Sequence, residues 1–150
     1  MSTSEIANII TNAFKQGKKI LICGNGGSFS MASHFAAELQ GRFKKERRAL
    51  PAIALNDGSI ITAIANDYSF DKVFSRQIEA LGEKDDILIT LSTSGTSKNI
   101  IEAQRVAIER DMIVIPFPTN QELVSDTAKT QETHLSYIHE ICEKVENNFV

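Results

Sequence analysis

The sequence predicts an α/β fold in which helices cover both faces of a mainly parallel sheet, as a three-layer αβα arrangement. One observation supports this fold class, and a second supports the domain organisation. Short apolar runs rich in β-branched residues alternate with segments whose apolar residues recur at helical spacing. The 150 residues contain no linker-like stretch and no internal repeat. We therefore expect a single domain that spans residues 1–150.

Each element follows from a local pattern. Ser2 and Glu5 fit a capping box, and the apolar residues after them predict a helix over residues 3–16. Short apolar runs predict buried strands at residues 19–23, 52–55, 86–91 and 112–117. Further helices are expected at residues 28–40, 58–65, 69–82, 98–110 and 131–149. Residues 118–129 show neither pattern and are expected to be irregular.

The composition argues against several classes of protein. There are 16 Lys and Arg residues against 19 Asp and Glu residues, and this mild acidity argues against a nucleic-acid binder. No apolar run approaches the ~18 residues of a membrane span, and residues 1–5 show no secretory signal. Cys23 and Cys142 form no pair motif and lie in apolar stretches, which is typical of buried free thiols in the cytoplasm.

Two unusual loops follow predicted strands. The polar loop over residues 92–97 (STSGTS) joins a buried strand to a helix, whose free N–H groups and dipole favour an anion such as phosphate. The same hydroxyls are also preferred helix caps, so a purely capping role stays open. The loop over residues 24–28 (GNGGS) permits close backbone approach to a ligand, or is simply a tight turn. Ligands of parallel sheets bind at the carboxyl ends of strands, so we expect both loops at one site.

Acid–base or metal-ligating side chains occur on two predicted helices. His34 and Glu38 lie four residues apart on one helix face. Gln131 and His139 border the apolar face of the last helix, and helical spacing places them within roughly 80° of each other around it. Imidazole and carboxylate groups serve as acids and bases or as zinc ligands, whereas a surface pair or a core histidine would be the plain alternatives.

Four stretches together resemble the phosphoheptose isomerases, a family of the sugar isomerase (SIS) domain superfamily. The stretches are GNGGSFSMASHFAAELQGRF (24–43), LPAIALNDGSIITAIANDYSFDKVFSRQIEALG (50–82), DILITLSTSGTSKNI (86–100) and QETHLSYIHEICEKVE (131–146). The resemblance implies a SIS-type, flavodoxin- or Rossmann-like fold. It also implies conversion of sedoheptulose 7-phosphate to D-glycero-D-manno-heptose 7-phosphate through an enediol, for heptose and surface-polysaccharide biosynthesis.

The resemblance also implies roles for individual residues. The phosphate-binding loop corresponds to Ser92, Thr93, Ser94 and Ser97, and the sugar-phosphate loop to Asn25, Gly26 and Gly27. A further substrate-contacting pair corresponds to Asn66 and Asp67, which otherwise read as a turn that starts a helix. The zinc-binding set corresponds to His34, Glu38, Gln131 and His139. Within that set, Glu38 and Gln131 also contact substrate, and Glu38 and His139 are the acid–base pair.

The chain departs from the family at two places. The family has an additional N-terminal helix, and it has a further strand where residues 118–130 are compressed here, so we expect the sheet to lack an edge strand. The resemblance implies a homotetramer with sites between subunits, a small sugar-phosphate ligand, and no nucleic acid or membrane partner. The alternative is a non-catalytic regulatory SIS module. A relative that binds the replication initiator departs at the positions of Glu38 and His139, and this chain keeps both.

Overall fold

Four parallel strands form one sheet in the computed structural model, which describes residues 1–150. The strands are β1 (Ile20–Gly24), β2 (Ala52–Ala54), β3 (Ile87–Leu91) and β4 (Ile113–Pro116). Their order is β2-β1-β3-β4, so the chain reverses its direction of travel across the sheet between β1 and β3. This is the flavodoxin-like order, whose ligands bind at that switch point. All four strands predicted from the sequence are confirmed.

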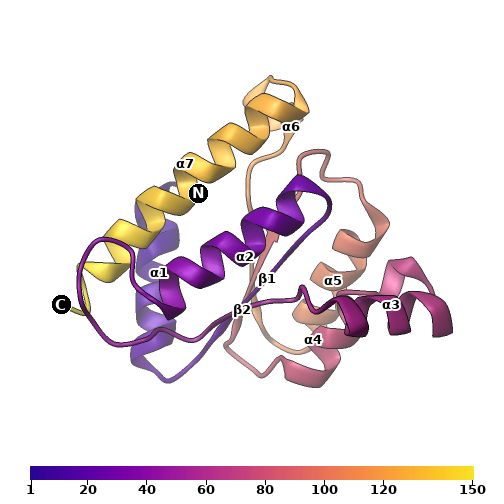
Figure 1. The fold of residues 1–150 in the computed structure, drawn as a ribbon, viewed down its shortest axis with the longest axis horizontal. Helices are drawn as coiled ribbons and strands as arrows, with labels where there is room; N and C mark the ends of the chain where they lie inside the picture. The colour runs from indigo at the N-terminus through magenta and orange to yellow at the C-terminus, as the bar shows by residue number, and fades with distance from the viewer.

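Helices cover both faces of the sheet, which confirms the three-layer arrangement (Figure 1). One face carries α1 (Thr3–Lys15), α2 (Gly27–Gln40) and α7 (Thr127–Glu146). The other face carries α3 (Gly58–Asp67), a short 3-10 turn η1 (Phe70–Lys72), α4 (Ser75–Leu81) and α5 (Lys98–Glu109). A single-turn helix, α6 (Asn120–Leu123), precedes α7. No helix is both long enough and apolar enough to cross a membrane.

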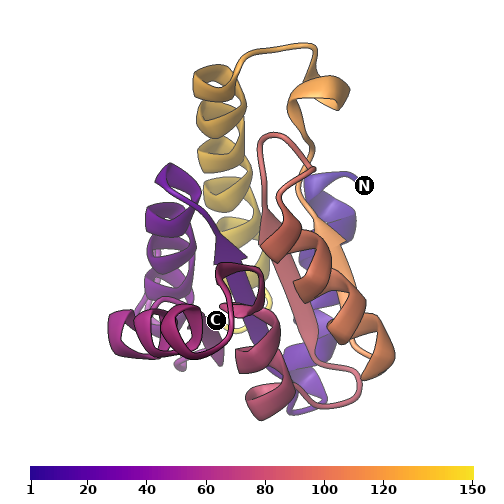
Figure 2. The same cartoon turned by 90° about the vertical axis from the view of Figure 1, so that its right-hand side faces the viewer.

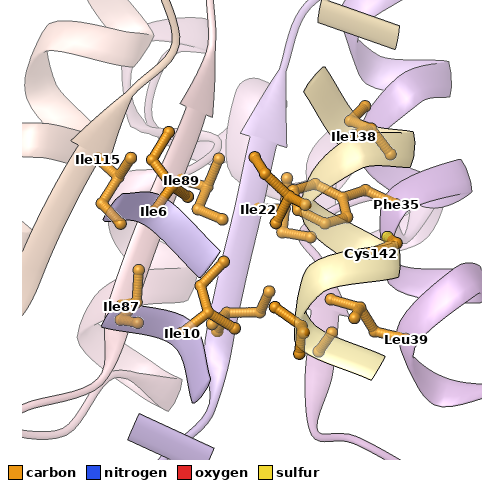
Figure 3. Packing of buried hydrophobic residues seen from close by; sticks show 14 of the residues in the cluster. Ile6, Ile10, Ile22, Phe35, Leu39, Ile87, Ile89, Ile115, Ile138 and Cys142 are labelled. Carbon is orange, nitrogen blue, oxygen red and sulfur yellow. The ribbon is translucent and has the colours of Figure 1, made fainter. Parts of the chain in front are cut away.

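Alternating side chains of the central strands build two apolar cores. Ile20 and Ile22 of β1 face α1, α2 and α7, whereas Leu21 and Cys23 face the opposite helices. Both faces of β1 and β3 are fully buried, which is why these strands read as continuous apolar runs. Figure 3 shows the first core, where Phe35 from α2 and Ile138 from α7 pack beside the strands. The first core therefore joins α2 and α7, which carry the candidate acid–base residues.

Two element predictions were wrong. Residues 69–82 do not form one helix, because η1 ends at Lys72 and α4 begins at Ser75. Over a single turn, the spacing of a 3-10 helix resembles that of an α-helix, so the apolar pattern did not separate them. Residues 118–129 are not wholly irregular, since α6 lies within them and α7 already begins at Thr127. The Asp126 side chain caps α7 by accepting from the N–H of Lys129, so the helix begins four residues before the predicted start at 131.

His134 fastens the segment between β4 and α7 to the core. Its side chain is fully buried against Phe117, and its Nε2–H donates to the carbonyl of Pro118 at 2.6 Å. The Nε2 proton leaves Nδ1 as an acceptor, and Nδ1 has no hydrogen-bond partner. Protonating this ring would bury a charge without a partner, so the fold requires the neutral imidazole.

Acidification is expected to destabilise the fold through His134. Burial lowers the pKa of His134 below its ordinary value, and the contact with the Pro118 carbonyl opposes this only in part. The unfolded chain takes up the proton near pH 6.5, as ordinary histidines do, whereas the folded chain takes it up only at a lower pH, because its pKa is lowered. His134 therefore supports the fold fully above that pH, and the support falls by up to about 1.4 kcal/mol per pH unit below it.

Urea unfolding between pH 8 and pH 5 measures this effect. His134→Gln keeps an N–H donor for the carbonyl of Pro118 but does not titrate in this range. The free energy of unfolding of the variant should therefore depend less steeply on pH than that of the wild type. Parallel profiles for the two proteins would contradict the assignment.

Candidate active site

A polar cavity of about 230 Å³ lies at the carboxyl ends of β1 and β3, at the switch point of the sheet. Both loops singled out from the sequence line it, so their predicted convergence is confirmed. The helix α7 closes the cavity from the other side with Thr127 and Gln131. The residues that line the cavity are Asn25, Gly26, Gly27, Ser28, Leu91, Ser92, Thr93, Ser94, Ser97, Thr127 and Gln131.

Two serine hydroxyls of the loop after β3 accept hydrogen bonds from the loop's own backbone. Ser92 Oγ accepts from the N–H of Gly95 at 2.9 Å, and Ser94 Oγ accepts from the N–H of Thr96 at 3.1 Å. Gly95 adopts a φ of +73°, a backbone conformation that favours glycine. Ser97 occupies the N-cap of α5, but its side chain makes no capping hydrogen bond. The start of α5 is therefore free to bind an anion, as the phosphate interpretation of this loop requires.

A pair of asparagines joins the two loops. Asn25 Nδ2 donates to Asn99 Oδ1, and Asn99 Nδ2 donates back to Asn25 Oδ1, both at 2.9 Å. Asn99 is buried in the first turn of α5 and was missed in the sequence analysis, as was Thr127. An amide two residues after a phosphate-type loop, at the start of the predicted helix over residues 98–110, was the available signal for Asn99, whereas nothing local distinguished Thr127. The amide pair fixes the spacing of the two loops across the cavity.

Gly24, the last residue of β1, is packed too closely for any side chain. A Cβ atom there would lie 2.8 Å from the carbonyl oxygen of Leu91 and 2.9 Å from that of Ser28. Both obstacles are backbone atoms, so neither can turn aside. We expect Gly24→Ala to lower the free energy of unfolding by about 1–3 kcal/mol, as overpacked cores do.

Thermal or urea unfolding measures this effect, with Gly58→Ala as the matched control. A Cβ atom at Gly58 meets nothing within 4 Å, and Gly58 is the first residue of α3. That control should be neutral or slightly stabilising. If the two alanine variants were equally stable, the close approach at Gly24 would be disproved.

A second cluster lies at the interface where α2 packs against α7, which is called the seam from here on. His34 Nε2 is 3.3 Å from His139 Nε2 and 3.7 Å from Glu38 Oε2. The side chain of His34 is 43% exposed and that of Glu38 is 25% exposed, so the cluster opens to solvent. The ring of Phe43 stacks on His139, with 5.5 Å between ring centroids and 24° between ring planes. The structure thus brings together three of the four residues in the metal-binding set that the resemblance implies, His34, Glu38 and His139.

These three side chains can hold a metal ion. One ligand atom from each of His34, Glu38 and His139 lies within 4.8 Å of the other two. Two nitrogen ligands of a tetrahedral zinc ion lie about 3.3 Å apart, given the usual zinc–nitrogen distances, and the two imidazole nitrogens match that separation. The donor set of two imidazoles and one carboxylate is also one that zinc accepts. The residues therefore fit a divalent metal.

Gln131 lies in the polar cavity, about two helical turns before His139 on α7. Its amide packs against Gly27, where a Cβ atom would come within 2.7 Å of Gln131 Nε2. Gly27 and His34 are likewise about two helical turns apart on α2. Figure 2 shows that α2 and α7 lie side by side and run in the same direction. The cavity and the His–Glu cluster are therefore two ends of one seam.

Asn66 and Asp67 lie apart from this seam. They are the last two residues of α3 rather than the start of a loop, which corrects the sequence-based expectation. Asn66 Nδ2 donates to Asp67 Oδ1 at 3.1 Å, and both residues are exposed. Neither residue lines the cavity or joins the His–Glu cluster of the same chain. Figure 1 shows α3 on the opposite side of the sheet from α7.

The two cysteines take no part in either end of the seam. Burial raises the pKa of the Cys23 thiol to about 12. Burial, followed by the charge of Glu38, also raises the pKa of the Cys142 thiol. Both side chains are free and fully buried. Thiols of this kind are inert packing groups rather than nucleophiles, as the sequence indicated.

The chain matches known proteins over most of its length. Residues 2–118 match the family model for the SIS domain. The phosphoheptose isomerase of Campylobacter concisus is 48% identical over 155 aligned positions, which cover 94% of this chain and 82% of the relative. The phosphoheptose isomerase of Thermodesulfovibrio yellowstonii is also 48% identical, over 95% of this chain and 78% of the relative. The first alignment has more positions than the chain has residues. The relative therefore contains residues within the aligned region that have no counterpart in this chain.

Solved structures agree with these matches. A phosphoheptose isomerase from Neisseria gonorrhoeae superposes with a TM-score of 0.87 at 40% identity, over 97% of this chain and 85% of that one. A phosphoheptose isomerase from Francisella tularensis gives a TM-score of 0.88 at 35% identity, with the same two coverages. The resemblance noted in the sequence is therefore confirmed in sequence and in fold. The chain belongs to the SIS-domain family and, within it, to the phosphoheptose isomerases.

Proposed function

We propose that this protein converts sedoheptulose 7-phosphate to D-glycero-D-manno-heptose 7-phosphate, as a step of heptose biosynthesis. One observation carries the proposal: an anion-binding cavity and a His–Glu cluster lie at the two ends of one seam between α2 and α7. A sugar phosphate has its anionic group at one end of the carbon chain and its carbonyl group near the other. The seam offers each end the chemistry that it needs.

The cavity would bind the phosphate group. Ser97 and the first turn of α5 offer a free hydroxyl and unsatisfied N–H groups, and Thr93 and Ser94 offer further donors. On the opposite side, Asn25 and the glycines that follow it would contact the sugar phosphate. A phosphate held remotely from the reacting carbons contributes binding energy that fixes those carbons in place.

The cluster would move the proton. Glu38 removes a proton from C1 of the ketose while His139 protonates the carbonyl oxygen on C2, which gives the enediol. The C1 hydroxyl then gives its proton back to His139, and C2 receives one from the acid form of Glu38, which gives the aldose. No atom is gained or lost, and Glu38 and His139 return to their starting forms.

We further propose that the metal is zinc, bound by His34, Glu38 and His139. Gln131 is the fourth member of the set that the family resemblance implies, and its place in the cavity also suits a contact with substrate. A bound zinc ion would polarise the carbonyl oxygen of the substrate as a Lewis acid. The Glu38 carboxylate would both bind the ion and accept the substrate proton.

Assembly and location complete the proposal. Asn66 and Asp67 are exposed on α3, away from the seam of their own chain. Their role as substrate contacts would therefore be exerted on the seam of a neighbouring copy, in a homotetramer with sites between subunits. Two buried free thiols without a disulfide suit the reducing cytoplasm.

The test is isomerase activity on sedoheptulose 7-phosphate, with zinc and with a chelator, read as aldose product by chromatography. The proposal expects product with zinc and little product after chelation. A folded protein that yields no product with zinc, yet still binds the sugar phosphate, would point instead to the non-catalytic regulatory module. Sedimentation of the same sample tests the tetramer.

A further inference from the structure

The loop between α2 and β2, residues 41–51, is anchored on α7 by a single buried carboxylate. Glu146, the last residue of α7, is 1% exposed. Its two oxygens accept the backbone N–H groups of Phe43, Lys44 and Lys45 at 2.7–2.9 Å. Burial raises the pKa of Glu146, but these three hydrogen bonds and the nearby Arg47 guanidinium together lower it by more than burial raises it. The pKa of Glu146 is therefore below its ordinary value, and the carboxylate stays ionised.

Arg47 connects this anchor to the end of α2. Its side chain is fully buried, and Nε lies 3.1 Å from Glu146 Oε2. The same guanidinium donates to the backbone carbonyls of Glu38, Leu39 and Gly41 at 2.7–2.9 Å. These carbonyls belong to the last turn of α2 and its cap, which have no partner within the helix. Arg47 thus holds the helical turn of Glu38 against the last turn of α7.

The loop also touches the other acid–base residue. Phe43, whose N–H is held by Glu146, stacks its ring on the imidazole of His139. His139 lies about two turns before Glu146 on the same helix. One loop therefore contacts both members of the acid–base pair: Arg47 binds the backbone of Glu38, and Phe43 covers the ring of His139.

Stability alone does not account for this arrangement. A buried ion pair loses its hydration, and apolar residues of similar volume are often as stabilising. The pair instead gives a defined geometry, because Glu146 binds three backbone N–H groups of the loop and Arg47 binds three backbone carbonyls at the end of α2, each in a fixed direction. Proton transfer is sensitive to such geometry, since a displacement of about 1 Å can lower the rate by about 100-fold.

We propose that Glu146, Arg47 and Phe43 are positioning residues, which set the plane of the His139 ring and its distance from Glu38. The proposal rests on the isomerase function proposed above. None of the three lines the polar cavity, so they should act on proton transfer and on metal binding rather than on the phosphate grip.

The test compares Phe43→Leu, Phe43→Tyr and Glu146→Gln with the control Glu143→Gln. Glu143 lies one turn before Glu146 on α7, but its side chain is 48% exposed and pairs only with the exposed Lys44. For each variant, kcat and KM are measured with saturating zinc, and zinc affinity is measured by competition with a chelating dye. Circular dichroism confirms that each variant is folded.

Phe43→Leu should lower kcat about 10-fold and leave KM within about two-fold, because the stacking contact is lost while the cavity is intact. Phe43→Tyr, which keeps the aromatic face, should restore kcat to within about two-fold of the wild type. Glu146→Gln should lower both kcat and zinc affinity, and Glu143→Gln should change neither. The tyrosine rescue and the separation of kcat from KM distinguish positioning from a general loss of structure.

Wild-type kcat and zinc affinity in folded Phe43→Leu would overturn the proposal, as would an equal loss in Glu143→Gln. If Glu146→Gln does not fold, the two Phe43 variants decide the outcome. If the wild type is inactive, the isomerase proposal fails by itself. Zinc affinity then decides positioning, because it should be weaker in Phe43→Leu and unchanged in Glu143→Gln.

Discussion

Replacing Glu38 with glutamine is expected to lower kcat by about 10²–10⁴-fold, the range that a positioned general base contributes. Glutamine has nearly the same shape, but it cannot accept the C1 proton of the ketose, and it removes the carboxylate from the metal-ligating set. The side chain is 25% exposed and four residues from His34 on α2, so the substitution should leave the fold intact. Steady-state kinetics with sedoheptulose 7-phosphate and saturating zinc measure the effect.

The matched control is Glu140→Gln on α7, next to His139. The side chain of Glu140 is 56% exposed and is paired with Lys144 rather than with the cluster. Its kcat should remain within about two-fold of the wild type, as expected for an exposed ion pair. His139→Ala, in contrast, should lose activity as severely as Glu38→Gln. Substantial activity in Glu38→Gln would remove Glu38 from the role of base and would place the proton transfer on another group.

Removing the phosphate from the substrate is expected to lower kcat/KM by about 1,000-fold or more. Hydrogen bonds to a charged group are worth about 1.5–3 kcal/mol each, and the cavity offers several donors. Part of this binding energy serves to orient the reacting carbons, so kcat should fall along with affinity. Turnover of sedoheptulose against that of sedoheptulose 7-phosphate measures the effect.

Inhibition by inorganic phosphate gives a second test of the same cavity. Phosphate should compete with the phosphorylated substrate, and Ser97→Ala should weaken the inhibition because it removes a hydroxyl that α5 does not use as a cap. Ser69→Ala, just before η1 and outside the cavity, serves as the control. Equal turnover of the two sugars would show that the cavity does not bind the phosphate group.

Local sequence patterns were sufficient to predict the strands of the sheet and the position of the cavity. The strands read clearly because residues such as Ile22 and Leu88 are buried in runs with both faces covered. Once the strands were known, the meeting of the two loops followed from parallel topology. The His34–Glu38 pair was also readable, because helical spacing places the two side chains on one face.

The parts that sequence missed depend on contacts between distant residues. Glu146 is an ordinary acidic residue at the end of a helix until the loop 41–51 folds onto it. Asn99 acquires its meaning only from Asn25, which lies 74 residues earlier. The end of α3 at Asp67 was missed because Asn66 and Asp67 are residue types that favour turns, so the predicted helix stopped at residue 65.

The most direct test of the account follows sedoheptulose 7-phosphate by NMR in deuterium oxide with zinc-loaded protein. The account predicts that the aldose 7-phosphate appears with solvent deuterium at C2, and that Glu38→Gln forms neither the aldose nor deuterated ketose. If the folded, zinc-loaded wild type leaves the ketose unchanged, or if Glu38→Gln forms product at the wild-type rate, the assignment of this site as an isomerase centre is contradicted.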